Sequence, residues 1–208
     1  MKTKTLVDIK KYKYKDMFER FIKEQNPAMC VSGCFDVTNI YSHKNRYRFN
    51  AMMCYCVAKA AQSVEEMHYS IGADKKLYYH SDVKINFGVK AKDGIPYWGD
   101  VVYTDSFVDF AKEYDRVREY CYLNCKYYQV DNGALISTSA VTNFPFTSFS
   151  IANSDIFWDS FLLWGRYYEE NNRVKLNITL RFHHAIIDME CAGNFFNALQ
   201  KQFDDFYV

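Results

Sequence analysis

The stretch RVKLNITLRF at residues 173–182 is followed at once by HHAIID at residues 183–188. Every second residue from Val174 to Phe182 is apolar, which predicts a β-strand with one buried face and one polar face. An amphipathic helix is expected next, from about Glu190 to Phe206. The adjacent histidines therefore stand at a predicted strand-to-helix junction, where reactive groups are often held rigidly.

The chain upstream of this stretch alternates between helical and extended patterns. Helical spacing of apolar residues predicts helices at residues 16–24, 46–67 and 106–124, and extended segments are expected at residues 76–89, 134–141 and 161–168. Strands and helices that follow one another without strict βαβ alternation predict an α+β fold with a mixed β-sheet. Three prolines, eight glycines and no linker-like stretch predict one domain, residues 1–208.

The composition excludes several classes of protein. The 208 residues are 49% hydrophobic, 18% aromatic and 25% charged, which argues against disorder. The formal net charge of +1 gives no net attraction to nucleic acid, so a nucleic-acid partner is not expected. No stretch approaches the roughly 20 apolar residues of a membrane helix. The start of the chain lacks the apolar segment of a signal peptide, so a cytoplasmic location is expected. Seven cysteines without a C-x-x-C pair are expected to be reduced.

The histidine pair allows more than one interpretation. One histidine could pack in the core while the other faces solvent, with no chemical role. A metal site is not expected, because neighbours on a strand point to opposite faces, so His183 and His184 are poorly placed to share one ion. A catalytic role is the third possibility, since the pKa of histidine lies near neutral pH.

Several ordered segments resemble one enzyme family. HHAIID at residues 183–188 resembles the H-H-x-x-x-D-G signature of the chloramphenicol acetyltransferase family, a version of which occurs in the acyltransferase cores of 2-oxoacid dehydrogenase complexes. The segments SA at 139–140, FTSF at 146–149, ANSDIF at 152–157, GRYY at 165–168 and NFFNALQ at 194–200 resemble further family segments in the same order, and so do VDI at 7–9 and FERF at 18–21. The resemblance thus covers the whole chain.

The resemblance implies a fold and a set of catalytic residues. The fold would be a two-layer sandwich of the coenzyme A-dependent acyltransferase type, with the helices mainly on one face of the sheet. His184 would be the general base, and Ser148 would donate a hydrogen bond to the oxyanion rather than act as nucleophile. Asp188 could orient the histidine or, as the resemblance implies, hold the active-site loop through a cation. Acetyl-CoA would be the cosubstrate in a direct transfer without a metal.

Binding residues and assembly follow from the same resemblance. Arg166 stands where the family has a lysine and would favour a coenzyme A phosphate, although a solvated arginine is an equal alternative. Met29, Phe87 and Phe149 are candidates for an acceptor pocket, with core packing as the alternative for each. The family forms trimers with the active site between subunits, so a homotrimer is expected, in which His184 faces a pocket made largely by the neighbouring subunit.

Two positions depart from the family pattern. The glycine that ends the signature is Met189, and the N-terminal arginine that pairs with the signature aspartate falls at Tyr14. Either Lys13 or Lys15 compensates, or Asp188 accepts hydrogen bonds from the backbone or from polar neighbours, because an unpaired buried carboxylate is costly.

Three functional hypotheses result. The first is an acetyl-CoA-dependent O-acetyltransferase that acts on chloramphenicol or a similar small hydroxyl compound. The second is a binding or catalytically impaired member of the same fold, which the changes at Tyr14 and Met189 favour. The third is the acyltransferase core of a multienzyme complex, against which the absence of lipoyl and subunit-binding segments argues.

Overall fold

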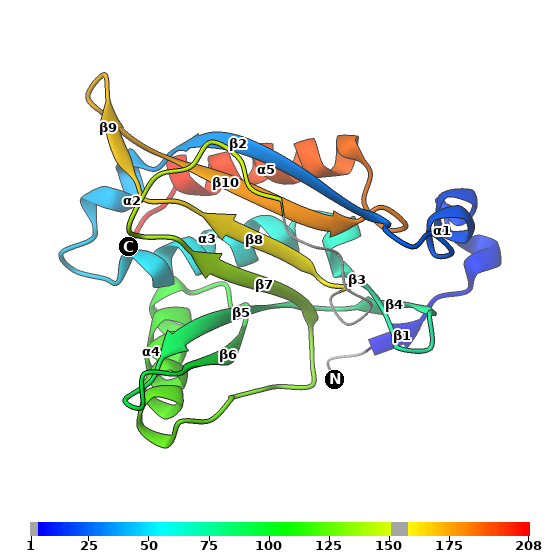
Figure 1. The fold of residues 1–208 in the computed structure, drawn as a ribbon, viewed down its shortest axis with the longest axis horizontal. Coiled ribbons are helices and arrows are strands. Elements are labelled where there is room, and N and C mark those ends of the chain that lie inside the picture. The colour runs from blue at the N-terminus through cyan, green and yellow to red at the C-terminus, as the bar shows by residue number, and fades with distance from the viewer. Residues whose placement is uncertain (1–3, 151–157) are drawn as a thin grey trace.

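The computed structural model describes residues 4–150 and 158–208 as a seven-stranded mixed sheet, a small second sheet and flanking helices (Figure 1). In chain order the elements are β1 (Lys4–Leu6), η1 (Ile9–Lys11), α1 (Lys15–Phe21), β2 (Ala28–Asp36), α2 (Thr38–Ser42), α3 (Phe49–Gln62), η2 (Glu65–His68), β3 (Tyr69–Ile71), β4 (Leu77–His80), β5 (Val83–Lys90), β6 (Pro96–Val102), α4 (Phe107–Asn124), β7 (Ala134–Ala140), β8 (Ser160–Trp164), β9 (Tyr168–Glu170), β10 (Arg173–His183) and α5 (Met189–Asp204).

The large sheet has the strand order β2-β10-β8-β7-β5-β6, and β9 pairs with the start of β10. β5, β7 and β8 are parallel neighbours, whereas β10 is antiparallel to both β2 and β8. In the register of β10, His183 lies opposite Ala28 of β2, and Ile178 lies opposite Trp164 of β8. β10 is thus an interior strand, and its last residue is followed directly by His184.

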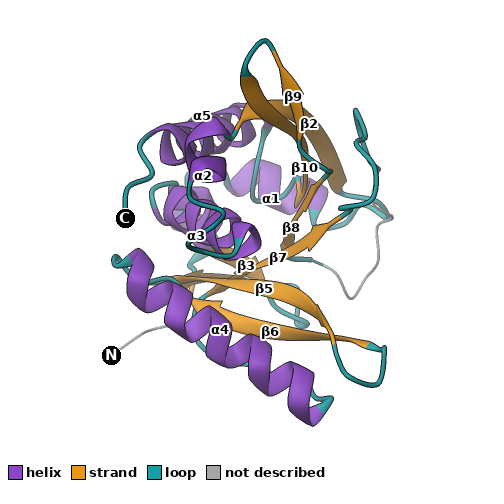
Figure 2. Ribbon diagram, turned by 90° about the vertical axis from the view of Figure 1, so that its left-hand side faces the viewer, coloured by secondary structure: helices purple, strands orange, loops and turns teal. Residues whose placement is uncertain are grey.

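The longer helices lie on one side of the large sheet, as Figure 2 shows for α3, α4 and α5. α4 begins as expected, because the Ser106 side chain accepts a hydrogen bond from the Asp109 amide, and it ends at Cys125 in the left-handed region with φ 51°. Met52, Met53 and Val57 of α3 are fully buried in a core that also includes Phe195 and Phe203 of α5. The expected α+β fold with its mixed sheet and one-sided helices is confirmed.

Local differences from the expected elements have physical reasons. The helix expected at 46–67 is confined to α3, because residues 43–48 form turns before it and Ser63 follows it as the C-cap. The strand expected at 161–168 divides into β8 and β9 at residues 165–167, where the Arg166 amide leaves the pairing with β10 and donates to Phe144 O. The polar face expected along β10 is also wrong at one end, because Thr179, Arg181 and His183 are buried. Arg181 is covered there by the 158–160 segment, donating from Nη2 to Asp159 O.

Within residues 4–150 and 158–208, no helix combines the length and apolarity needed to cross a membrane.

Candidate active site

His184 is held by three contacts at the turn after β10. Its backbone amide donates to Pro27 O at 2.8 Å, its Nδ1 lies 3.0 Å from Ile187 O, and the Phe21 ring packs on the imidazole with 4.1 Å between centroids. A carbonyl oxygen only accepts, so Nδ1 carries the hydrogen in the bonded form. In the neutral ring the lone pair is then on Nε2, which is the arrangement that a general base requires.

His183 has a different environment, although it is the preceding residue. It is 7% exposed, its ring stacks on Trp158 at 5.3 Å, and its Nδ1 accepts from the Ala185 amide at 3.1 Å. Nε2 is buried and has no hydrogen-bond partner among the described residues. Burial lowers the pKa of His183 to about 4, with the Arg181 charge as a smaller cause, so this ring stays neutral. The two histidines therefore do not share a site.

Asp188 caps the last helix. Its Oδ1 accepts from the Cys191 amide at 2.8 Å, and this hydrogen bond lowers the pKa of the carboxyl group. Because Nδ1 of His184 is bonded to the Ile187 carbonyl, the Asp188 side chain does not orient the imidazole as a triad acid would. The geometry favours a structural role, in which Asp188 fixes the turn between His184 and α5.

The position of the missing family arginine is close to this cap. The Tyr14 hydroxyl lies 3.9 Å from Sγ of Cys191 in the first turn of α5. Lys13 pairs with Glu66 at 2.8 Å, and Lys15 pairs with Glu19 at 4.0 Å, so neither lysine serves Asp188. Of the alternatives considered for Asp188, the structure shows a hydrogen bond from the backbone, donated by the Cys191 amide.

A cavity of about 720 Å³ lies between the sheet and the start of α3. Phe49, Phe87, Trp98, Trp164 and Tyr167 supply aromatic walls, whereas Lys90 and Arg166 supply two cations. None of the described lining residues is acidic. An aromatic cavity with cations and no carboxylate suits a ligand that combines a flat ring with negative charge.

Phe87 and Arg166, which the sequence suggested separately, thus belong to the same cavity. Phe87 is 1% exposed and stacks on Tyr114 at 4.0 Å, so it contributes to the core as well as to the cavity wall. Met29 does not lie there, because it pairs with Phe182 in the β2–β10 register and is half-buried next to the histidine end.

A cationic loop next to the cavity was missed from the sequence. Residues 43–48 read HKNRYR, and Lys44, Arg46 and Arg48 line a second hollow of about 460 Å³, which Asp115 also lines in an ion pair with Arg48 at 2.9 Å. This loop leads directly into Phe49 of α3, and Tyr41 packs on Tyr167 at 4.8 Å between centroids. The density of basic residues in this hexapeptide was the available signal for an anion-binding region.

Ser148 and Phe149 lie in the long connection between β7 and β8. Both are exposed, and the Phe149 ring is 6.2 Å from that of Phe146. The Phe146 carbonyl accepts from Nδ2 of Asn177 at 2.5 Å, so this part of the connection is anchored on β10 seven residues before His184. Residues 151–157, which include the whole ANSDIF segment, lie outside the described residues.

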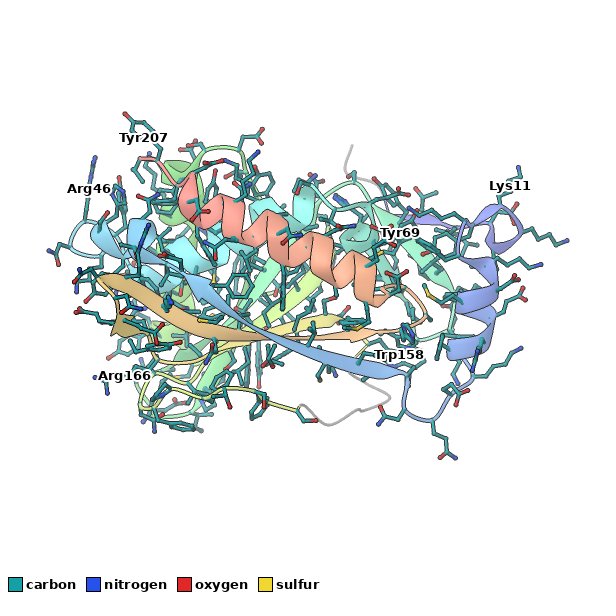
Figure 3. All side chains as sticks on the ribbon, turned by 90° about the horizontal axis from the view of Figure 1, so that it is seen from above. Lys11, Arg46, Tyr69, Trp158, Arg166 and Tyr207 are labelled. Atoms are coloured by element: carbon teal, nitrogen blue, oxygen red, sulfur yellow. The ribbon has the colours of Figure 1, made fainter. Side chains whose placement is uncertain are left out.

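Five of the predicted site residues fall into two groups, one at the carboxyl end of β10 and one at the cavity. His184, Asp188 and Met29 lie at the carboxyl end, whereas Arg166 and Phe87 line the cavity, whose Gly165 wall meets β10 near its middle, at Asn177. Gly165 is bonded to Asn177, and seven residues of strand separate that position from His184 by about 23 Å. Figure 3 shows Trp158, whose ring stacks on His183, on the side of the molecule towards Lys11, whereas Arg166 and Arg46 lie at the opposite end.

The part of the chain that the structure describes contains no group of three or more His, Cys, Asp or Glu side chains arranged to hold a metal ion.

Sequence comparisons identify relatives over almost the whole length. The profile of the family described as Chloramphenicol acetyltransferase matches residues 2–200. The chain is 23% identical over 203 residues to a chloramphenicol acetyltransferase of Vibrio anguillarum, with 94% of this chain and 92% of the relative covered. It is 24% identical over 213 residues to one from Escherichia coli, with 97% and 94% covered.

Solved structures agree on the fold. One chloramphenicol acetyltransferase superposes with a TM-score of 0.83 at 20% identity, covering 96% of this chain and 99% of its own. A probable dihydrolipoamide acetyltransferase from Listeria monocytogenes 4b F2365 superposes with a TM-score of 0.71 at 17% identity, covering 93% and 92%. The expected acyltransferase type of sandwich is confirmed. Since the family profile extends over nearly every residue, the chain belongs to the chloramphenicol acetyltransferase family, a family of O-acetyltransferases.

Proposed function

We propose that the protein transfers an acetyl group from acetyl-CoA to a hydroxyl group of chloramphenicol or a similar small molecule, with His184 as the general base. The observation that carries the proposal is the bond between Nδ1 of His184 and Ile187 O, which leaves the Nε2 lone pair for a substrate proton. His183 does not compete for this role, because it is buried and bonded through Nδ1.

The chemical step needs two groups. Nε2 of His184 takes the proton of the acceptor hydroxyl while the oxygen attacks the thioester carbonyl, and a tetrahedral oxyanion forms. The Ser148 hydroxyl donates a hydrogen bond to this oxyanion. The carbon–sulfur bond then breaks, and the coenzyme A sulfur takes the proton from the imidazolium. The acetyl group passes directly to the acceptor without a covalent enzyme intermediate.

The cavity at Arg166 would receive the coenzyme. Coenzyme A carries an aromatic base and phosphates, and the lining offers aromatic rings with Lys90 and Arg166. The basic loop of residues 43–48 adds Lys44 and Arg46 at the same end of the molecule. Charge-assisted hydrogen bonds from such side chains to phosphate oxygens are among the strongest in proteins.

The arrangement also supports a homotrimer. His184 lies about 23 Å along β10 from Asn177, which bonds to Gly165 at the cavity, so a site between subunits would bring His184 of one copy to the cavity and Ser148 of the next. We therefore propose that the active protein is a homotrimer of single-domain chains that acts in the cytoplasm and requires no metal, nucleic acid or membrane. Met29, Phe87 and Phe149 would contribute to the acceptor pocket.

The test is release of free coenzyme A thiol from acetyl-CoA with and without chloramphenicol, followed by a panel of other hydroxyl compounds and dihydrolipoamide. We expect thiol release that depends on chloramphenicol and on His184. Thiol release only with another hydroxyl compound would identify that compound as the acceptor in place of chloramphenicol, and the proposed mechanism would stand. Coenzyme A binding without thiol release for any acceptor would instead support the binding member of the fold.

A further inference from the structure

Glu66 is a buried carboxylate outside the proposed catalytic residues. It lies in η2 and is 8% exposed, and its described side-chain partners include two from the N-terminal segment: Nζ of Lys13 at 2.8 Å and the Tyr14 hydroxyl at 3.4 Å. Burial opposes its ionisation, but the Lys13 ammonium and hydrogen bonds from its own backbone and Cys191 together outweigh this, so the pKa of Glu66 is lower than usual. Glu66 is therefore a charged anchor on the body of the protein for this segment.

The segment that Glu66 holds, residues 13–21, has little intrinsic helical stability. α1 spans only the seven residues Lys15–Phe21, and its N-cap, Tyr14, makes no capping hydrogen bond through its side chain. Figure 1 shows α1 at the end of the molecule, beyond the large sheet. Helices this short are marginal without tertiary contacts, so the position of α1 depends on where it is tied down.

The far end of the same segment reaches the proposed general base. Phe21, the last residue of α1, packs on the His184 imidazole with 4.1 Å between centroids. At the start of the segment, the Tyr14 hydroxyl also contacts Cys191, three residues after the helix cap at Asp188. One short segment thus contacts both the ring of His184 and the first turn of α5, and Glu66 holds that segment to the body of the protein.

We propose that Glu66 is a positioning residue for His184, acting through the segment from Lys13 to Phe21; this inference rests on the proposed function. When the segment is anchored at Glu66, Phe21 packs against the His184 imidazole and stabilises the hydrogen bond from Nδ1 of His184 to Ile187 O. Without the anchor, the imidazole samples other orientations and tautomers. The turnover number then falls, because small misplacements of a reacting group reduce rates strongly.

The test compares Glu66→Gln with Glu65→Gln. Glu65 is a matched control, because it pairs with the same Lys13 at 3.3 Å but its side chain is 55% exposed. We expect Glu66→Gln to lower kcat about 10-fold to 100-fold, with little change in the KM for acetyl-CoA or in the KM for the acceptor. Glu65→Gln should leave kcat and both KM values unchanged. Equal effects of the two variants, or an effect confined to KM, would overturn the proposal.

A double-mutant cycle identifies the route. Phe21→Ala removes the contact with His184, so adding Glu66→Gln to it should cost little more if Glu66 acts through Phe21. Fully additive losses would show that Glu66 acts by another route and would overturn the inference. Tyr14→Phe, which removes one hydroxyl contact and keeps the ring, serves as a milder second variant if Glu66→Gln does not fold, and a full wild-type kcat in it would count against the proposal.

A spectroscopic measurement separates this inference from the proposed function. Nitrogen-15 spectra of the histidine rings should show a fixed Nδ1–H tautomer for His184 in the wild type and in Glu65→Gln, and averaged tautomer signals in Glu66→Gln. This result does not require activity. If the wild type transferred no acetyl group, the proposed function would fail while the anchor could still stand; an unchanged tautomer in Glu66→Gln would disprove the anchor alone.

Discussion

The carboxyl end of β10 and the cavity beside the middle of this strand present different chemical groups. At the carboxyl end, the carbonyl oxygens of Pro27 and Ile187 and the Phe21 ring fix the position of His184. Beside the middle of the strand, a cavity of about 720 Å³ has aromatic walls and two cations, but no described histidine or acid lines it. The first region suits the proposed base, and the second suits the proposed coenzyme.

The difference teaches that, in the proposed mechanism, one copy of the chain separates the groups that the reaction must combine. A general base acts only within hydrogen-bond reach of the proton that it removes, whereas His184 lies about 23 Å along β10 from Asn177, the strand residue beside the cavity. A cyclic trimer offers the same pair of surfaces three times, so the base end of one copy can meet the ligand end of the next. The predictions below test each end and then their combination.

The largest effect is expected at the base end. His184→Ala removes the proposed base, and we expect acetyl transfer to fall by about 10²–10⁴-fold. Coenzyme A binding should be retained, because the proposed coenzyme contacts lie at the cavity, away from this end of the strand. Steady-state acetylation measured beside coenzyme A binding checks both statements. Near-normal turnover in this variant would contradict the mechanism.

Mixing two impaired variants tests whether the ends combine between copies. Ser148→Ala alone should lose about 10²–10³-fold in rate, as expected for removing one oxyanion donor. If each site takes His184 from one chain and Ser148 from the next, refolding equal amounts of His184→Ala and Ser148→Ala together should restore about a quarter of the wild-type sites. Unmixed samples refolded in the same way are the control. No recovery in the mixture would place both residues of a site in one chain.

A smaller effect is expected at the ligand end. Arg166→Ala removes a charge that we assign to a coenzyme A phosphate, and a lost charge-assisted hydrogen bond costs about 1.5–3 kcal/mol. The KM for acetyl-CoA should rise about 10-fold to 100-fold, with kcat nearly unchanged. Arg166→Lys, which keeps the charge, should show a smaller rise. A fall in kcat without a change in this KM would mean that Arg166 has another role.

Sequence periodicity predicted the elements whose patterns are local. The alternation in β10 and the helical spacing and cap of α4 appear in the structure with nearly the expected bounds. The strands β2 and β6 were not expected, because Gly33 interrupts the first pattern and Pro96 and Gly99 interrupt the second. Their strand conformation comes from pairing with β10 and β5, which is a long-range interaction.

The candidate site was predictable to a similar extent. The family motif located His184 and Asp188, and the sequence pattern placed them at the end of a strand. The shared cavity of Phe87 and Arg166 required the sheet order, and the contact of Phe21 with His184 joins residues that are distant along the chain. The basic residues of the loop at 43–48 are visible in the sequence. That the loop lies near Tyr167 is not, because the contacts of Tyr41 and Phe49 with Tyr167 depend on how α2 and α3 pack.

The smallest expected effect is on the pH dependence of the free energy of unfolding, which distinguishes His183 from His184. The pKa of His183 is about 4 in the folded protein because of burial, compared with about 6.5 in an unfolded chain. Between these values the unfolded state binds a proton that the folded state excludes, so stability is complete above pH 6.5 and falls as the pH is lowered. His183 alone should contribute a slope of about 1 kcal/mol per pH unit between pH 6 and pH 5.

The variant His183→Gln isolates this contribution. His80, whose burial lowers its pKa to about 4, adds the same dependence to both proteins, and Asp159, whose burial raises its pKa to about 6, adds the opposite dependence to both. The difference between the slopes of the wild type and the variant therefore belongs to His183. Urea unfolding at pH 5, 5.5 and 6, at one fixed protein concentration, measures it. Parallel slopes would show that His183 is protonated or solvated in the folded protein, and the contrast between its buried ring and the half-buried ring of His184 would lose its physical basis.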